Sequence, residues 1–138
     1  SDGVPEDLAN KVRSMSLDSA EEFTAYEEGS PVHPSWPAMH SAASSASLWL
    51  AVVLNLTPEQ YCEAQLVDYA VSYARTVAGV HYPTDNIAGL NLGSEIMAEQ
   101  LADHLAINYG SDRDTVQAKI DQIKFDWATF DPQDCAKA

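Results

Sequence analysis

Apolar residues recur at helical spacing through most of the chain, and no segment shows the strong alternation of apolar and polar residues that is typical of a half-buried strand. Near the N-terminus, Leu8, Val12 and Met15 follow the spacing of one helix face. A second short helix is expected over residues 18–27, ended by Gly29. The pattern as a whole predicts an all-α fold, a bundle of five or six helices.

A proline-rich segment interrupts this pattern. Three prolines between residues 31 and 37 exclude a regular helix and predict an extended, rigid loop. The residues that follow, 38–56, are small or apolar and carry no charge. This run predicts one continuous helix, buried on nearly every side and central to the fold.

Two helices after this run have recognisable ends. Residues 57–60, Thr-Pro-Glu-Gln, supply an N-cap, a proline at the first position and a capping glutamine for a helix that continues to Gly79. Thr84 is the expected cap of the next helix, which runs to about residue 107 and stops at Gly110.

The last helix is expected to begin at Ser111, with Asp114 three residues on as its capping partner. Its inner stripe runs from Val116 to Trp127, and Pro132 lies beyond its end.

Composition fits a globular chain and narrows its partners. The 138 residues are 46% hydrophobic and 20% charged, which predicts a single helical domain over 1–138. The formal net charge of −14 argues against nucleic acid or an anionic membrane surface, because each would need a basic patch. The longest apolar stretch, 48–54, is too short to span a bilayer, so no membrane span is expected.

The cysteines and the N-terminus leave the compartment open. Cys62 and Cys135 allow one disulfide if the C-terminal tail folds back, and two thiols otherwise. Residues 1–3 are not a signal peptide, so the chain is cytoplasmic, already processed or a piece of something longer.

One arginine is a candidate functional residue. Arg75 is the sole lysine or arginine between residues 14 and 112. Amid small and apolar residues it requires an anionic partner, because a buried charge without one is costly. The structural alternative is an ion pair with Glu63, Asp68 or Asp85.

The spacing around Arg75 carries more information than its isolation. The residues concerned are Arg75, Gly79, His81 and Asp85. This spacing resembles the last signature motif of the superfamily that joins vanadium-dependent haloperoxidases to type 2 phosphatidic acid phosphatases. Upstream, Pro37-Ala38-Met39-His40 stands where that superfamily has Pro-Ser-Gly-His. The amino-acid sequence of 28–37, 77–82 and 90–93 looks closest to that of the algal bromoperoxidases. The resemblance covers roughly 28–96.

The resemblance implies a vanadate cofactor, with phosphate as its analogue, and a role for each motif residue. Arg75 would grip the equatorial oxygens of the oxyanion. His81 would bond vanadium, or attack phosphorus in a phosphatase, and Asp85 would orient His81. His40 would be the acid–base group. His33 stands where a bromoperoxidase histidine shapes the halide environment. On this basis we expect Arg75, His40 and His81 to converge on one pocket.

The chain departs from the family pattern in two places. Ala38 and Met39 replace the serine and glycine before the catalytic histidine, which removes a hydroxyl donor and a close backbone approach, and Met39 is expected to fill space that the anion needs. The family's first motif, a lysine with Arg-Pro seven residues on, is also missing; Lys11-Val12-Arg13 is the sole upstream basic cluster. A partner chain or a missing N-terminal segment would then have to supply the cations.

Three functions remain as hypotheses. The first is a vanadium-dependent haloperoxidase-like domain, which oxidises halide with hydrogen peroxide and is incomplete or inactive alone. The second is an acid phosphatase of the same superfamily. The third is a non-catalytic accessory subunit of a larger complex that keeps the fold. The chain resembles the C-terminal half of a haloperoxidase, which favours a fragment, a processed product or a shrunken relative.

Overall fold

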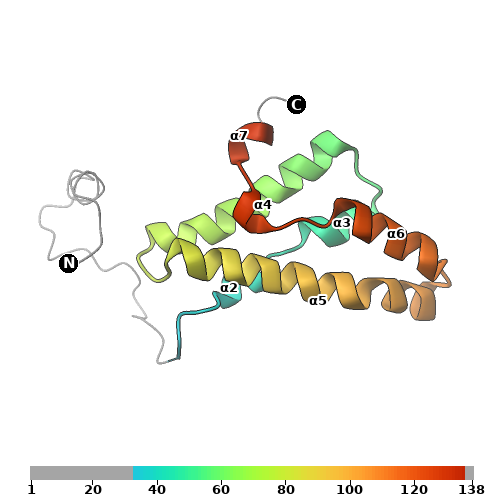
Figure 1. Cartoon of the computed structure of the whole chain (residues 1–138), viewed down its shortest axis with the longest axis horizontal. Coiled ribbons are helices and arrows are strands. Elements are labelled where there is room, and N and C mark those ends of the chain that lie inside the picture. The colour runs from blue at the N-terminus through green and yellow to red at the C-terminus, as the bar shows by residue number, and fades with distance from the viewer. Residues whose placement is uncertain (1–32, 136–138) are drawn as a thin grey trace, which may run out of the picture. The chain divides into compact units, whose positions relative to one another are not determined.

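The computed structural model describes residues 33–135, which belong to one compact unit (Figure 1). This part contains helices and no strand, which confirms the all-α prediction. The elements are α2 (Met39–Ala43), α3 (Ser47–Val53), α4 (Pro58–Val77), α5 (Pro83–Tyr109), α6 (Arg113–Ile123), the 3-10 helix η1 (Trp127–Thr129) and α7 (Pro132–Cys135). The helices expected before Gly29 lie outside the described residues.

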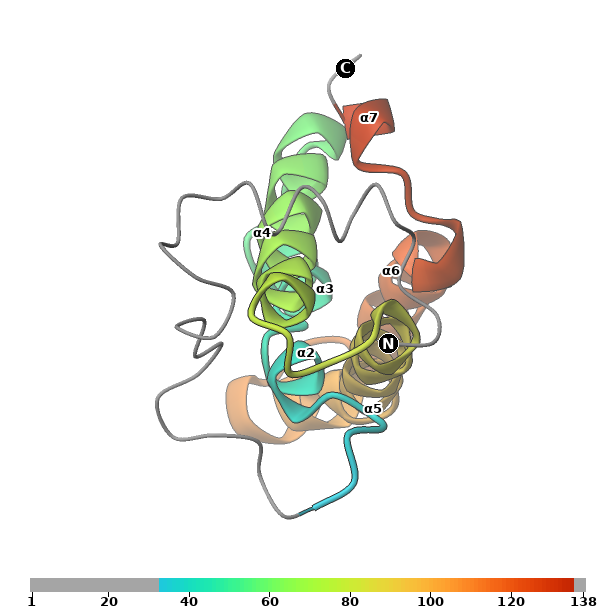
Figure 2. The ribbon, with the colours of Figure 1, turned by 90° about the vertical axis from the view of Figure 1, so that its left-hand side faces the viewer.

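Helices α4 and α5 are the two long elements, and a tight connection over residues 78–82 joins them (Figure 1). The short helices α2 and α3 each pack against both of them, and α6 packs on α3 and α5. An end-on view separates the α4 and α5 rods, with α2 and α3 beside them (Figure 2).

The predicted start of α4 is confirmed. The Thr57 hydroxyl accepts the N–H of Gln60 at 3.3 Å, and the Gln60 side chain accepts the N–H of Thr57 at 3.0 Å. This capping box satisfies two N–H groups that a helix start otherwise leaves without a partner. The helix ends where Gly79 adopts a positive φ of 74°, a conformation that glycine accepts without steric cost.

The predicted start of α5 is wrong by two residues. Tyr82, not Thr84, precedes the helix, because Asp85 reaches back and accepts the N–H of Tyr82 at 3.0 Å. The far end is as expected, since Gly110 closes α5 in the left-handed conformation with φ 70°. Asp112 caps α6 in place of Ser111, accepting the N–H of Thr115 at 2.7 Å.

The single helix expected over 38–56 is also wrong. The chain breaks at residues 44–46 and resumes as α3. Ser45 Oγ donates to the carbonyl oxygens of Ser41 and Leu90, each at 3.1 Å, so the serine side chain competes for backbone acceptors. Asp68 of α4 accepts the N–H groups of Ala46 at 3.2 Å and Ser47 at 2.9 Å, which caps α3 from a distant part of the sequence.

The segment 38–56 and helix α5 are buried to a similar degree, with about a third of the residues of each buried. Helix α5 contributes more buried residues than any other described helix. In α3, Leu48 is buried but Trp49 is 39% exposed. The core cluster consists of Leu48, Ala98, Leu101, Ala102 and Ile120.

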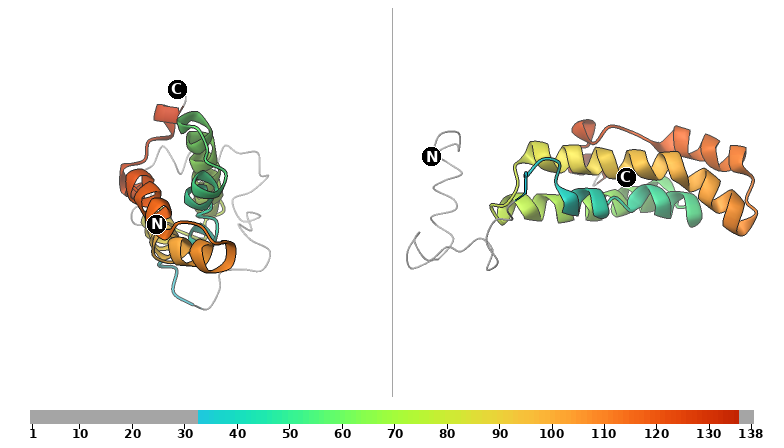
Figure 3. Two further views of the ribbon diagram at one scale, coloured as in Figure 1. Left: turned by 90° about the vertical axis from the view of Figure 1, so that its right-hand side faces the viewer. Right: turned by 90° about the horizontal axis from the view of Figure 1, so that it is seen from below.

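Two glycines of α5 set how closely the preceding segment packs. A Cβ on Gly89 would collide with the carbonyl oxygen of Ala38 and lie 2.8 Å from Cβ of Ser41. A Cβ on Gly93 would collide with the carbonyl oxygen of Ala42. The backbone of α2 therefore rests directly on the backbone of α5, as the view from below shows (Figure 3).

Helix α6 ends earlier than the sequence predicted. Ile120 is fully buried, but the helix stops at Ile123, and Trp127 belongs to the separate η1. Cys62 and Cys135 form a disulfide with Cα atoms 5.4 Å apart, which ties α7 to α4 and decides between the two alternatives left open by the sequence. Within residues 33–135 no helix has both the length and the apolar character needed to cross a membrane.

Candidate functional site

The connection between α4 and α5 holds the clearest constellation of motif residues. His81 Nδ1 lies 3.4 Å from Oδ2 of Asp85, and each side chain is 6% exposed. The same carboxylate oxygen accepts the N–H of Tyr82, so its position is set by the helix start itself. Because Nδ1 faces the carboxylate, Nε2 is the ring nitrogen that remains for a ligand.

Arg75 stands on the last turn of α4, next to this pair along the chain. Its carbonyl oxygen accepts the N–H groups of Val80 at 3.2 Å and His81 at 3.3 Å, which folds the connection back on the helix end. The Nε atom of Arg75 is buried. Arg75 follows Asp68 and Ser72, which are buried on the same helix, so α4 presents an unusually polar inner face.

The motif that contains His40 reaches the same region through its backbone. Ala38 is fully buried and donates its N–H to the carbonyl oxygen of Asp85 at 2.9 Å. His40 itself is exposed, in the first turn of α2. The structure thus joins the segment before His40 to the segment after His81. The meeting of the side-chain ends of Arg75, His40 and His81 stays a prediction.

Two residues of the upstream segment, Met39 and His33, lie differently from what the sequence suggested. Met39 is 61% exposed, so most of its side chain does not fill buried space as the sequence suggested. His33 is exposed, and its Nδ1 lies 2.9 Å from the carbonyl oxygen of Pro34, its own neighbour. Among the described residues, no contact joins His33 to His81 or Asp85.

Sequence reasoning missed three polar residues that link the motif segments. Ser41 Oγ donates to Oδ1 of Asn86 at 3.1 Å, and Nδ2 of Asn86 donates to Oγ1 of Thr76 at 2.7 Å. Each of the three directly follows a motif residue, since they come after His40, Arg75 and Asp85. That adjacency was a signal in the sequence, but only the fold shows that the three side chains meet.

A buried carboxylate one helical turn from Ser72 completes the polar face of α4. Asp68 is 3% exposed, and burial raises its pKa above the ordinary value. The N–H groups of Ala46 and Ser47 oppose this rise by stabilising the ionised form. Asp68 therefore anchors α3 through the N–H groups of Ala46 and Ser47.

The other cations of the described part bind elsewhere. Arg113, Lys119 and Lys124 lie on α6 or at its end, over the half of α5 remote from the α4–α5 connection (Figure 1). Their partners are Asp103, Asn55 and Glu95, respectively. Within residues 33–135, Arg75 is therefore the one lysine or arginine that lies next to the α4–α5 connection along the chain.

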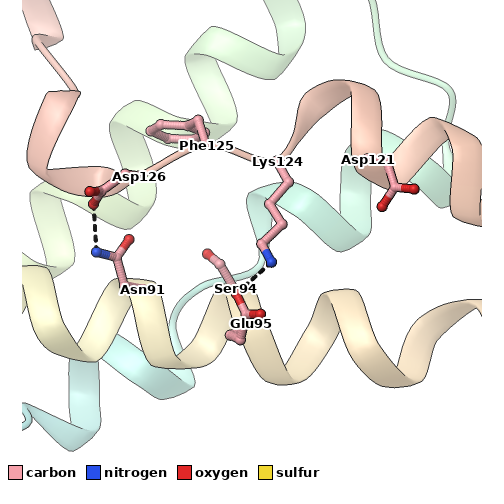
Figure 4. Close-up of a pocket in the computed structure, with 7 residues that line it drawn as sticks. All are labelled: Asn91, Ser94, Glu95, Asp121, Lys124, Phe125 and Asp126. Atoms are coloured by element: carbon pink, nitrogen blue, oxygen red, sulfur yellow. Dashed lines mark hydrogen bonds and ion pairs between the residues drawn. The ribbon is translucent and has the colours of Figure 1, made fainter.

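A groove between α5 and the end of α6 contains none of the motif residues (Figure 4). Its volume is about 510 Å³. It is lined by Asn91, Ser94, Glu95, Asp121, Lys124, Phe125 and Asp126. In the described part, no group of three His, Cys, Asp or Glu side chains is arranged to hold a metal ion.

Comparisons with known proteins give one match. The family model of the PAP2 superfamily matches residues 12–98, which span both motifs and most of the chain. No curated protein and no solved structure matches this chain.

Proposed function

Because this chain belongs to the PAP2 superfamily, we propose that its segment from Arg75 to Asp85 binds a tetrahedral oxyanion, as part of a vanadium haloperoxidase-like domain. The observation that carries the proposal is the contact between His81 Nδ1 and Asp85 Oδ2. A buried carboxylate that holds one imidazole nitrogen is the usual support of a histidine whose other nitrogen is a ligand or nucleophile.

Some of the groups that an oxyanion site needs are present in this chain. Arg75 supplies a planar, permanently charged fork that matches two oxygens of phosphate or vanadate. His81 offers Nε2, and exposed His40 offers an imidazole that can serve as the acid–base group. A bound vanadate would supply the centre at which hydrogen peroxide is activated for halide oxidation. The chain's own residues would hold that anion and move protons beside it.

The donor set is smaller than a tightly bound oxyanion requires. The Ala38 N–H is taken by the carbonyl oxygen of Asp85, so it is not free for an anion. The cations of α6 bind other partners. Each missing charge-assisted bond costs roughly 1.5–3 kcal/mol. We therefore propose that full activity needs cations from a longer chain or from a partner chain.

A phosphatase and a non-catalytic subunit are the alternatives. The Arg-Gly-His-Asp motif serves phosphoryl transfer equally well, with His81 as nucleophile. The occupied Ala38 N–H favours the non-catalytic alternative, since it leaves the upstream motif serving the fold.

Titration with orthovanadate, followed by vanadium-51 NMR, tests the site directly. We expect weak binding to the wild-type chain, about tenfold weaker or more in His81→Ala, and unchanged binding in His104→Ala. His104 is the matched control, because it is an exposed histidine on α5. Equal binding by all three proteins, or no binding to the wild type, contradicts an oxyanion site at His81.

Two activity measurements separate the functions. With vanadate, bromide and hydrogen peroxide, we expect little bromination by the isolated chain, and with an aryl phosphate little hydrolysis. Ala38→Ser with Met39→Gly should improve oxyanion binding modestly, and an added segment bearing lysine and arginine should improve it more. Robust bromination that is lost in His81→Ala would show the chain to be a complete haloperoxidase, and hydrolysis lost in the same variant would favour the phosphatase.

A further inference from the structure

Asn86 stands where three segments of the fold meet. Its side chain is almost fully buried, with the residue 5% exposed. Its side-chain oxygen Oδ1 accepts a hydrogen bond from the Ser41 hydroxyl of α2, and its side-chain nitrogen Nδ2 donates one to the Thr76 hydroxyl of α4. Asn86 lies in the first turn of α5, so one side chain links all three helices.

Beside the Asn86 link, the Ala38 N–H donates to the carbonyl oxygen of Asp85 and Ser45 donates to that of Leu90, so hydrogen bonds tie the start and the end of α2 to α5. Helix α2 has five residues, no side chain caps its start, and Ser41 is its one buried residue. Its close packing on Gly89 and Gly93 is backbone against backbone, without large side chains that would interlock and resist sliding. Directional hydrogen bonds in a buried site are then the features that set its register.

The geometry of a carboxamide suits this task better than any other side chain. It carries one acceptor and one donor at a fixed separation in one plane. Its oxygen meets a hydroxyl that donates, and its nitrogen meets a hydroxyl that accepts. An aspartate would lose the donor to Thr76, and an apolar residue would leave both hydroxyls without this partner.

We infer that Asn86 is a positioning residue of the oxyanion site, an inference that rests on the function proposed above. It fixes α2 relative to the end of α4, and so His40 relative to Arg75 and His81. The two hydroxyls that it binds belong to Ser41 and Thr76, which directly follow His40 and Arg75 in the sequence. A displacement of either hydroxyl-bearing residue therefore also moves the motif residue before it. Asn86 acts through these neighbours and not on the anion.

Asn91 supplies a matched control on the same helix. Its Nδ2 donates to Asp126 at 2.7 Å and its Oδ1 accepts the N–H of Trp127 at 2.9 Å, so it too ties another segment to α5 with one bond of each kind (Figure 4). The segment it ties is η1, not a motif. Asn86→Ala and Asn91→Ala therefore remove the same groups from one helix at different places.

The test compares these variants by NMR and by vanadate titration. The imidazole signals of His40 and His81 are recorded without any anion. We expect Asn86→Ala to shift the signals of both histidines, and to weaken vanadate binding about tenfold. Asn91→Ala should leave the signals and the affinity as in the wild type.

Ser41→Ala and Thr76→Val each remove one of the two bonds and carry the test if Asn86→Ala does not fold. We expect Ser41→Ala to move the His40 signals and Thr76→Val to move those of His81. Unchanged signals in both, or equal effects of Asn86→Ala and Asn91→Ala, overturn the inference. If the wild type binds no vanadate, the proposed function fails, while the anion-free signals still decide the role of Asn86.

Discussion

Ala38 donates its backbone N–H to the carbonyl oxygen of Asp85 at 2.9 Å, which joins the two motifs of this chain across 47 positions of sequence. The bond brings the start of α2 to the first turn of α5, beside the carboxylate that contacts His81. It also uses the N–H at the position where the family pattern has a serine. One hydrogen bond therefore holds the two motif segments together.

Replacement of Asp85 should separate its two roles. Asp85→Ala removes both the support of His81 and the acceptor for the Tyr82 N–H, so we expect a loss of about 1–2 kcal/mol in the free energy of unfolding. Vanadate affinity should fall about 10–100-fold. Asp85→Asn keeps an acceptor and should retain most of the stability. Denaturant unfolding with vanadium-51 NMR measures both effects, and an unchanged affinity in Asp85→Ala would contradict the proposed orientation of His81.

Asp68 predicts a distinctive pH dependence. Burial raises its pKa above 3.8, so above that pH the native state binds more protons here than the unfolded state. Its contribution to stability is then fully present below 3.8 and is lost as pH rises through the raised pKa. We expect the wild-type free energy of unfolding, relative to Asp68→Asn, to fall with pH across this window.

Asp112 is the control for that measurement, because its shift has the opposite sign. The N–H of Thr115 and its side chain lower the pKa of this exposed carboxylate below 3.8. Its contribution is present above 3.8 and is lost as pH falls through the lowered value. Difference curves of the same slope for Asp68→Asn and Asp112→Asn would show that Asp68 does not titrate as a buried acid.

Leu48 and Trp49 are neighbours on α3 with different surroundings. Leu48 is 3% exposed within the core cluster, so Leu48→Ala should cost about 2–5 kcal/mol. Burial of the whole run 38–56, as expected from the sequence, would give a similar loss for Trp49→Ala, but the exposure of Trp49 lowers our expectation to about 1–2 kcal/mol. Urea unfolding of both variants measures the ranking. A larger loss in Trp49→Ala would mean that another surface covers α3 in solution.

The disulfide predicts a dependence on reducing agent. Cys62 and Cys135 are 73 positions apart, so the bond closes a long loop in the unfolded chain, and its removal should cost about 2–4 kcal/mol. Unfolding with and without dithiothreitol measures this difference. The double variant Cys62→Ser/Cys135→Ser should match the reduced wild type and show no effect of the reductant. Two reactive thiols in the untreated protein would contradict the bond.

The sequence alone determined those features that depend on neighbouring residues. The start of α4 at Thr57 and the stop at Gly110 were predictable, because capping boxes and left-handed glycines act within a few positions. The contact between His81 and Asp85 is equally local, because only three residues lie between the two. The family motif could be recognised for the same reason, because it is defined by the spacing of residues that are close in the sequence.

Only the tertiary structure decided features that depend on distant partners. At the break over 44–46, the carboxylate of Asp68 caps α3 from another helix, and Ser45 donates to Leu90 of α5, so both contacts depend on residues outside the run 38–56. The pairing of the cysteines needed the tail to return to α4. The link through Asn86 needed Ser41 and Thr76 to arrive from two other helices. Helical periodicity records which face of a helix is apolar, but a buried hydrogen bond depends on which segments meet, and that is set by packing in three dimensions.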